Sequence, residues 1–192
     1  MSEKKSDVKI IAFVGMCGSG KSTAIEVLTN KNIPKVYFGG VILKAIEDAG
    51  LEITPENERK FREELRAKEG KDFVVKRVVQ NTKKLIEAGQ KRIVLDGLYS
   101  WTEYKILRQE FPQELSVVAI TAPKALRRKR LADRKERPFT VQESAERDKT
   151  EIENLEKGGP IAIADYYIDN SGTIAELHEQ VKKVLDEIDF FD

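Results

Sequence analysis

An eight-residue, glycine-rich segment, Gly15-Met-Cys-Gly-Ser-Gly-Lys-Ser22, constrains this chain more than any other feature. It follows an apolar run, Val8–Val14, and precedes a helical pattern over Lys21–Asn30. The spacing G-x-x-x-x-G-K-[ST] between a buried strand and a helix is the pattern of a loop that surrounds phosphates with backbone N–H groups. The glycines let the backbone approach the ligand, and the helix N-terminus attracts its negative charge. The sequence therefore predicts a site for a nucleoside triphosphate.

The residue types in this loop predict different roles. Lys21 is suited to the β- and γ-phosphates, and the hydroxyl of Ser22 is suited to Mg²⁺. A dinucleotide-binding fingerprint would lack this Lys-Ser pair. Cys17 is interpreted as a tolerated small residue rather than as a redox-sensitive thiol. The residues expected to bind the nucleotide here are Gly15, Cys17, Gly18, Ser19, Gly20, Lys21, Ser22 and Thr23.

The rest of the chain alternates between strand and helix patterns, which predicts a single α/β domain over residues 1–192 with a parallel sheet between helices. Residues 1–7 are expected to be a solvated tail. Two segments between expected strands are longer than a simple crossover connection requires. We expect 54–89 to be a helical insert that binds the acceptor, with a break at Gly70, and 127–159 to be a lid region. The five expected strands are 8–14, 34–38, 92–96, 115–121 and 166–169.

Several helix starts carry capping signals. Ser100, Thr140 and Thr173 are each followed three residues later by Glu, which is the capping-box pattern. Thr54-Pro55 combines an N-cap residue with a proline in the first helical turn. Lys124–Arg137 is predicted to be one basic helix that ends at Pro138.

Composition limits the classes of function. Lys and Arg number 34 and Asp and Glu number 33, so general nucleic-acid binding is not expected. The chain has one cysteine, which favours a reducing, cytoplasmic location. Its apolar runs are much shorter than the ~20 residues of a membrane helix, so no membrane association is expected.

A carboxylate and a run of cations are the other candidates for catalysis. Asp96 ends the apolar strand 92–96, at the sheet edge where α/β folds bind ligands. It is a candidate to orient Mg²⁺ through water or to act as a base toward an acceptor hydroxyl. Arg130 and Arg134 are four residues apart, so on a continuous helix they would share a face and could stabilise a transferring phosphoryl group. The basic run comprises Arg127, Arg128, Lys129, Arg130, Arg134, Lys135 and Arg137, and Arg147 is expected to join it from the other arm of the lid.

The helical insert carries candidates for binding a phosphate on the acceptor. Arg62 and Arg66 share a helix face and are the main candidates. Surface pairing with Glu58, Glu63 and Glu69 is an equally open interpretation of the same residues. Further candidates are Arg59, Lys76 and Arg77.

Four segments together resemble dephospho-CoA kinases and, more closely, the archaeal-type nucleotide kinase-like proteins related to them. They are Gly15–Thr23, Leu95-Asp-Gly97, Arg130-Leu-Ala-Asp-Arg134 and Ala164-Asp-Tyr-Tyr-Ile-Asp-Asn-Ser-Gly172. The resemblance covers about Lys9–Leu185 and implies a P-loop kinase fold with a five-stranded parallel sheet, ATP with Mg²⁺ as donor, and a closing lid. It also implies that Lys21 and Arg130 stabilise the transferring group and that Asn170 lies near the adenine.

The chain departs from these relatives at two positions. They usually carry an aspartate just after the second strand, where this chain has Gly39-Gly40, and often an arginine on the following helix turn, where it has Leu43. The departures weaken the case for dephospho-CoA itself as the acceptor. We therefore expect an ATP-dependent kinase that acts on a small nucleotide-like acceptor. A nucleoside monophosphate kinase is one alternative. A nucleotide-binding regulator or slow NTPase, and a kinase acting on RNA, are the others.

Overall fold

The computed structural model describes residues 6–136 and 138–192, apart from the side chains of Pro55 and Arg59. Arg137, the Arg59 side chain and residues 1–5 of the expected tail therefore lie outside the described residues. Five parallel strands form one sheet in the order β2-β3-β1-β4-β5. This confirms the predicted fold class. The strands are β1 (Lys9–Val14), β2 (Lys35–Tyr37), β3 (Arg92–Asp96), β4 (Leu115–Thr121) and β5 (Tyr166–Asp169).

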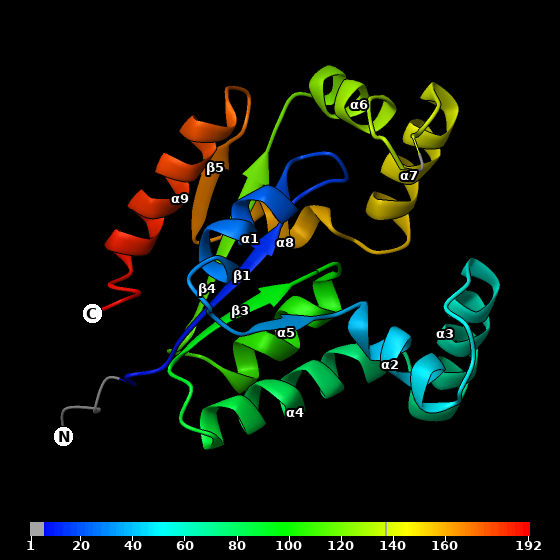
Figure 1. Cartoon of the computed structure of the whole chain (residues 1–192), viewed down its shortest axis with the longest axis horizontal. Helices are drawn as coiled ribbons and strands as arrows, with labels where there is room; N and C mark the ends of the chain where they lie inside the picture. The colour runs from blue at the N-terminus through cyan, green and yellow to red at the C-terminus, as the bar shows by residue number, and fades with distance from the viewer. Residues whose placement is uncertain (1–5, 137) are drawn as a thin grey trace.

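Helices cover both faces of the sheet (Figure 1). On one face α1 (Lys21–Thr29) and α9 (Ile174–Glu187) pack against the strands through residues such as Leu28 and Val181. On the other face α4 (Phe73–Glu87) and α5 (Trp101–Glu110) do so. Because the central strand β1 is enclosed from both sides, Ile10–Val14 are fully buried, as a continuous apolar run predicts.

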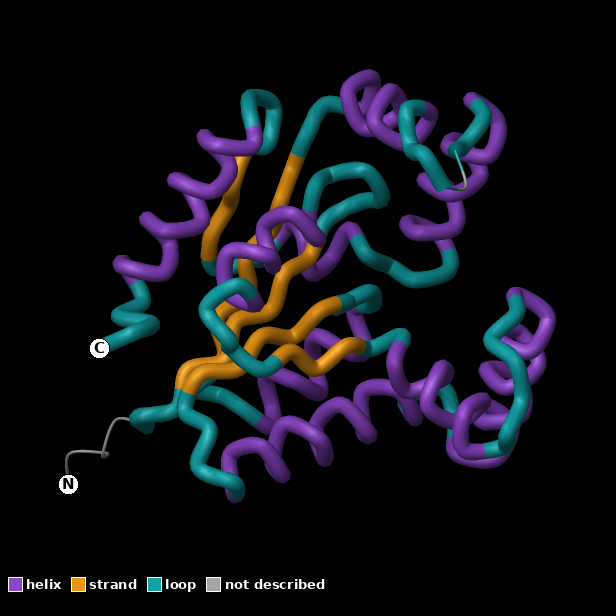
Figure 2. Tube along the Cα trace, in the orientation of Figure 1, coloured by secondary structure: helices purple, strands orange, loops and turns teal. Residues whose placement is uncertain are grey.

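Two pairs of helices project beyond the carboxyl ends of the strands (Figures 1 and 2). We call α2 (Gly40–Asp48) with α3 (Pro55–Glu69) the acceptor arm, and α6 (Lys124–Ala132) with α7 (Val141–Glu153) the lid arm. A short helix, α8 (Gly158–Ala162), follows the lid arm and is not apparent in the sequence pattern. Within the described residues, no helix combines the length and apolarity that a membrane crossing requires.

The helix caps follow the sequence signals. The side chains of Ser100, Thr140 and Thr173 each accept a hydrogen bond from a backbone N–H three residues later, and all three capping boxes are formed. Thr54 caps α3, with Pro55 in its first turn. The expected break at Gly70 is also present, because its φ of 95° is accessible to glycine and not to most other residues.

Within the expected insert 54–89, α4 buries Val75, Val78 and Val79 against the sheet and does not project with α3. One expectation for the helices was wrong. The basic helix ends at Ala132 rather than at Arg137, and the Phe139 N–H donates to the Leu131 carbonyl. A longer helix would bring more like charges onto adjacent turns, and this shorter one avoids that repulsion.

Candidate phosphate site

The glycine-rich loop lies between β1 and α1 and has the backbone geometry that its sequence predicts. Gly18 has a φ of 80° and Gly20 a φ of 98°, both in the left-handed region. A Cβ on Gly18 would lie 2.7 Å from the Arg127 carbonyl oxygen, and one on Gly20 would lie 2.1 Å from the Asn170 side-chain nitrogen. The loop is therefore packed closely between the lid arm and the segment after β5.

Lys21 begins α1 and points back over the loop. Its Nζ donates to the carbonyl oxygens of Gly15, at 2.6 Å, and Met16, at 3.3 Å. Burial, and then the charge of Lys157, lower the pKa of Lys21 to about 8. Ser22 is exposed in the same helical turn, and Thr23 follows it half-buried. Within the described part of the chain, no group of three or more His, Cys, Asp or Glu side chains could hold a metal ion.

Asn170 fixes the loop from the end of β5. Its Nδ2 donates to the Ser19 carbonyl at 2.8 Å, and its Oδ1 accepts from Arg130 at 3.5 Å. The residue is buried. Asp165, five residues earlier, accepts a hydrogen bond from the Val117 N–H at 2.7 Å and pairs with Arg108. The Ala164–Gly172 segment therefore attaches β5 to β4 at one end and to the phosphate loop at the other.

The arginines of the lid arm do not form one cluster. Arg127 is buried, and its guanidinium donates to the Cys17 carbonyl at 2.9 Å and to Asp148 at 2.7 Å. Arg130 faces Asn170. Arg134 lies beyond the end of α6, exposed, with its guanidinium 5.7 Å from the Phe139 ring. The prediction that Arg130 and Arg134 share a helix face was therefore wrong, because the helix ends between them.

A carboxylate on α7 binds the loop directly. The Cys17 N–H donates to Glu151 Oε2 at 2.9 Å, and Lys157 donates to Glu151 Oε1 at 2.5 Å. Arg147 lies 3.3 Å from the same Oε1. Burial opposes ionisation of Glu151, but the charge and hydrogen bond of Lys157 outweigh it and hold the pKa of the carboxyl below its ordinary value. The loop thus binds an anionic oxygen through a backbone N–H.

Asp96 lies at the carboxyl end of β3, as predicted, and forms an ion pair with Lys35 at 3.1 Å. The neighbouring β2 ends at Tyr37, whose ring lies over Gly39. A Cβ on Gly39 would come within 2.5 Å of the Tyr37 hydroxyl oxygen. The Tyr37 phenol therefore occupies the space beside Gly39 after the second strand.

A family model described as AAA domain matches residues 11–156 of this chain. A UPF0200 protein from Thermococcus kodakarensis is 35% identical over 182 residues, which cover 93% of this chain and 97% of that protein. The chain belongs to the AAA domain family and is a UPF0200 protein.

Solved structures with the same fold include P-loop kinases. A shikimate kinase from Bacteroides thetaiotaomicron matches with a TM-score of 0.60 and 12% identity, covering 94% of this chain and 98% of that one. A dephospho-CoA kinase from Campylobacter jejuni matches with a TM-score of 0.54 and 21% identity, covering 93% and 96%. At these identities the matches show the fold of the UPF0200 protein, and they agree with the family resemblance of its motifs.

Sequence reasoning did not identify Glu151 and Lys157 as site residues. The signal was the inner face of α7, where Ser144, Asp148 and Glu151 recur at the spacing of one helix face. Ser144 and Glu151 are buried. A helix that buries a polar and acidic stripe where a core would place apolar side chains indicates specific polar contacts, and here Glu151 binds the phosphate loop while Asp148 pairs with Arg127 of α6.

The acceptor-side candidates lie apart from the phosphate site. Arg62 and Arg66 are exposed on α3. Of the acids considered as their partners, Glu69 pairs instead with Arg77 of α4, at 2.5 Å. Lys76 pairs with Asp72.

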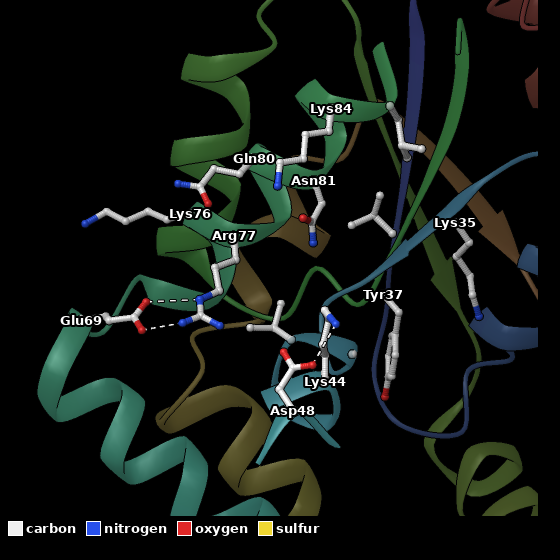
Figure 3. Close-up of a pocket in the computed structure, with 14 residues that line it drawn as sticks. Lys35, Tyr37, Lys44, Asp48, Glu69, Lys76, Arg77, Gln80, Asn81 and Lys84 are labelled. Atoms are coloured by element: carbon white, nitrogen blue, oxygen red, sulfur yellow. Dashed lines mark hydrogen bonds and ion pairs between the residues drawn. The ribbon is translucent and has the colours of Figure 1, made fainter. Parts of the chain in front are cut away.

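A pocket of about 910 Å³ lies beside the edge strand β2, between α2 and α4; we call it the edge pocket (Figure 3). Its lining includes no residue of the phosphate loop. Five of the lining residues are basic and two are acidic, and Asp96 and Asp72 pair with two of the basic residues from outside the lining, which leaves a net excess of one positive charge. The basic residues are Lys35, Lys44, Lys76, Arg77 and Lys84. Two of them point to acids within the pocket, Lys44 to Asp48 and Arg77 to Glu69 (Figure 3).

Proposed function

We propose that this UPF0200 protein transfers the γ-phosphate of ATP to a small, nucleotide-like acceptor. The observation that supports it most is the bound carboxylate in the phosphate loop, because a backbone N–H that binds a carboxylate oxygen is also suited to a phosphate oxygen. The left-handed Gly18 and Gly20 and the position of Lys21 belong to the same loop. The P-loop kinase fold is consistent with this chemistry.

In this proposal each site residue has a separate task. The loop N–H groups and Lys21 bind the β- and γ-phosphates, and Arg130 stabilises charge on the transferring group. Asn170 positions the loop through Ser19, and the segment around it borders the adenine. The exposed Ser22 hydroxyl and Asp96 are the residues that would hold Mg²⁺ arriving with the nucleotide, and the ion would neutralise phosphate charge. Asp96 is also the candidate to accept the acceptor's proton.

The acceptor is expected to be anionic. The exposed Arg62 and Arg66 and the edge pocket place positive charge on the acceptor side of the molecule. Dephospho-CoA and nucleoside monophosphates both fit this description. The Lys44→Met/Lys84→Met double variant tests whether the edge pocket binds the acceptor. It should raise the KM of the acceptor and leave ATP binding unchanged. An unchanged KM would exclude the edge pocket from acceptor binding.

The kinase proposal is tested by a coupled assay of ADP release. ATP is incubated with the protein and one acceptor at a time: dephospho-CoA, each nucleoside monophosphate and deoxynucleoside monophosphate, nucleosides and shikimate. At least one acceptor should raise turnover above the rate with ATP alone, and Lys21→Met should abolish the increase. If no acceptor has this effect, the kinase proposal is wrong.

A second candidate function is a slow NTPase that acts as a regulator. Two observations favour it: the ring of Tyr37 covers the backbone where related kinases place a carboxylate, and Asp96 is paired with Lys35. This function requires tight ATP binding and slow hydrolysis that no acceptor changes. The same assay distinguishes the two, since only a kinase responds to the acceptor.

A further inference from the structure

The buried ion pair between α7 and α8 has no role in the proposed transfer. Lys157 is 0% and Glu151 is 1% exposed, so both charges are withdrawn from water. Such burial is costly unless the charges are paired and their remaining hydrogen-bonding positions are satisfied. Here Glu151 is satisfied by groups from three places: Lys157, Arg147 and the Cys17 N–H of the phosphate loop.

The partners of Glu151 are those that a phosphate would need. They are a backbone N–H of a phosphate loop, an ammonium and a guanidinium, all converging on one carboxylate. The charges of Lys157 and Glu151 also act on Lys21, the phosphate-binding lysine of the loop. A carboxylate and a phosphate therefore compete for the same donors.

We propose that Glu151 is an internal anion that occupies the phosphate site of the nucleotide-free protein, and that Lys157 binds phosphate once a nucleotide displaces it. The inference rests on the proposed nucleotide site. When a phosphate of ATP displaces the Glu151 carboxylate, Lys157 exchanges one anionic partner for another. Its buried charge therefore always has a counter-charge. The apparent affinity for ATP is then the intrinsic affinity multiplied by the fraction of molecules in which Glu151 has left the site.

Two backbone features lie on either side of Lys157. Glu156 precedes Lys157 with a φ of 52°, in the left-handed region, between the end of α7 and the start of α8. Gly159 follows under the ring of Trp101, where a Cβ would lie 2.8 Å from the indole. Trp101 is the chain's one tryptophan, so its fluorescence reports on movement of α8.

The test measures the dissociation constant of ATP with Mg²⁺ by calorimetry, with Trp101 fluorescence as a second signal. Glu151→Gln should bind ATP roughly tenfold more tightly than the wild type, because the internal competitor is weakened. Glu151→Asp keeps the negative charge on a shorter side chain that cannot span both partners, and it should also bind more tightly. Glu153→Gln is the matched control on the exposed side of α7 and should leave affinity unchanged.

The assignment of Lys157 is tested by a double variant, Glu151→Gln/Lys157→Met. If Lys157 binds phosphate, the double variant should bind ATP roughly tenfold more weakly than Glu151→Gln alone. Equal affinities would overturn the role of Lys157.

Unchanged affinity in both Glu151→Gln and Glu151→Asp would overturn the competition. Tighter binding in Glu151→Gln with none in Glu151→Asp would also overturn it, because Glu151 would then act as a structural or distant charge. If the Glu151 variants do not fold, a crystal structure of the wild type with ATP decides, since Glu151 must then have left the Cys17 N–H. Absence of ATP binding in the wild type and every variant would instead refute the proposed donor site, and this inference with it.

Discussion

Asn170 offers a direct test of how the phosphate loop is held. The residue is buried, its Nδ2 donates to the Ser19 carbonyl at 2.8 Å, and its Oδ1 accepts from Arg130. Asn170→Asp preserves the size of the side chain and replaces this donor by an acceptor. The carboxylate would then face the Ser19 carbonyl without a hydrogen between them.

The expected loss of folding free energy follows from the hydrogen-bonding groups that the substitution leaves unpaired. Removing one partner of a buried hydrogen bond costs ~1–3 kcal/mol, and we expect the upper half of that range for Asn170→Asp because two acceptors repel. Asn170→Ala should lose less folding free energy than Asn170→Asp, because it leaves the Ser19 carbonyl unpaired without adding a charge. For a chain of this size each kcal/mol lowers the melting temperature by about 2–4 °C.

Urea unfolding followed by circular dichroism measures the loss, and ATP titration of the same samples measures its effect on the site. Both variants should bind ATP more weakly, because the Ser19-Gly20 backbone is no longer held. Ser171→Ala, at the exposed neighbouring position, is the control for the unfolding measurement. A free energy of unfolding for Asn170→Asp within about 0.5 kcal/mol of the wild type would refute the assigned hydrogen bond.

Three further predictions concern the loop, the lid arm and the pH dependence of binding. Gly18→Ala should destabilise the protein more than Gly50→Ala in thermal unfolding: both have positive φ, but only at Gly18 would the new Cβ meet another backbone. Arg130→Ala should lower kcat by at least about 10²-fold while Arg134→Ala stays near the wild type, because Arg134 lies outside α6; similar losses in the ADP-release assay would contradict this. The pKa of Lys21 is lowered to about 8 in the free protein, and bound phosphate would raise it, so ATP binding at about pH 9 should take up a proton; calorimetry in two buffers of different ionisation enthalpy measures this, and no uptake would argue against a phosphate contact by Lys21.

Local signals were sufficient to predict most of the fold. The strand 92–96 and the strand 115–121 match the structure at both ends, because continuous apolar runs between polar residues admit few alternatives in a buried parallel sheet. The capping boxes marked the starts of α5, α7 and α9 through side chains that act within one helical turn. The phosphate loop was predictable for the same reason, since its geometry depends on its own glycines.

The parts that could not be predicted depend on contacts between distant segments. Glu151 and the Cys17 N–H are 134 residues apart, and no local pattern relates them. The end of α6 depends on Phe139 returning to the Leu131 carbonyl, which the charge pattern does not reveal. The helical pattern of 73–87 was recognised, but only the structure shows that it packs on the sheet and does not project with α3.

The different attachment of the two arms has a consequence for how such proteins diverge. Among the residues of α3 whose side chains are described, none is fully buried. The helix lies between Gly50 and Gly70, which both have positive φ values. The lid arm, in contrast, contacts the phosphate loop through Arg127 and Glu151. Substitutions at the exposed positions of α3 therefore cost little folding energy, whereas Phe61 and Leu65 pack against the core. Among duplicated copies of such a gene, the exposed face of α3 is free to acquire new sequences, while α2, which buries Ile42 and Ile46, and the lid arm, which contacts the phosphate loop, are constrained.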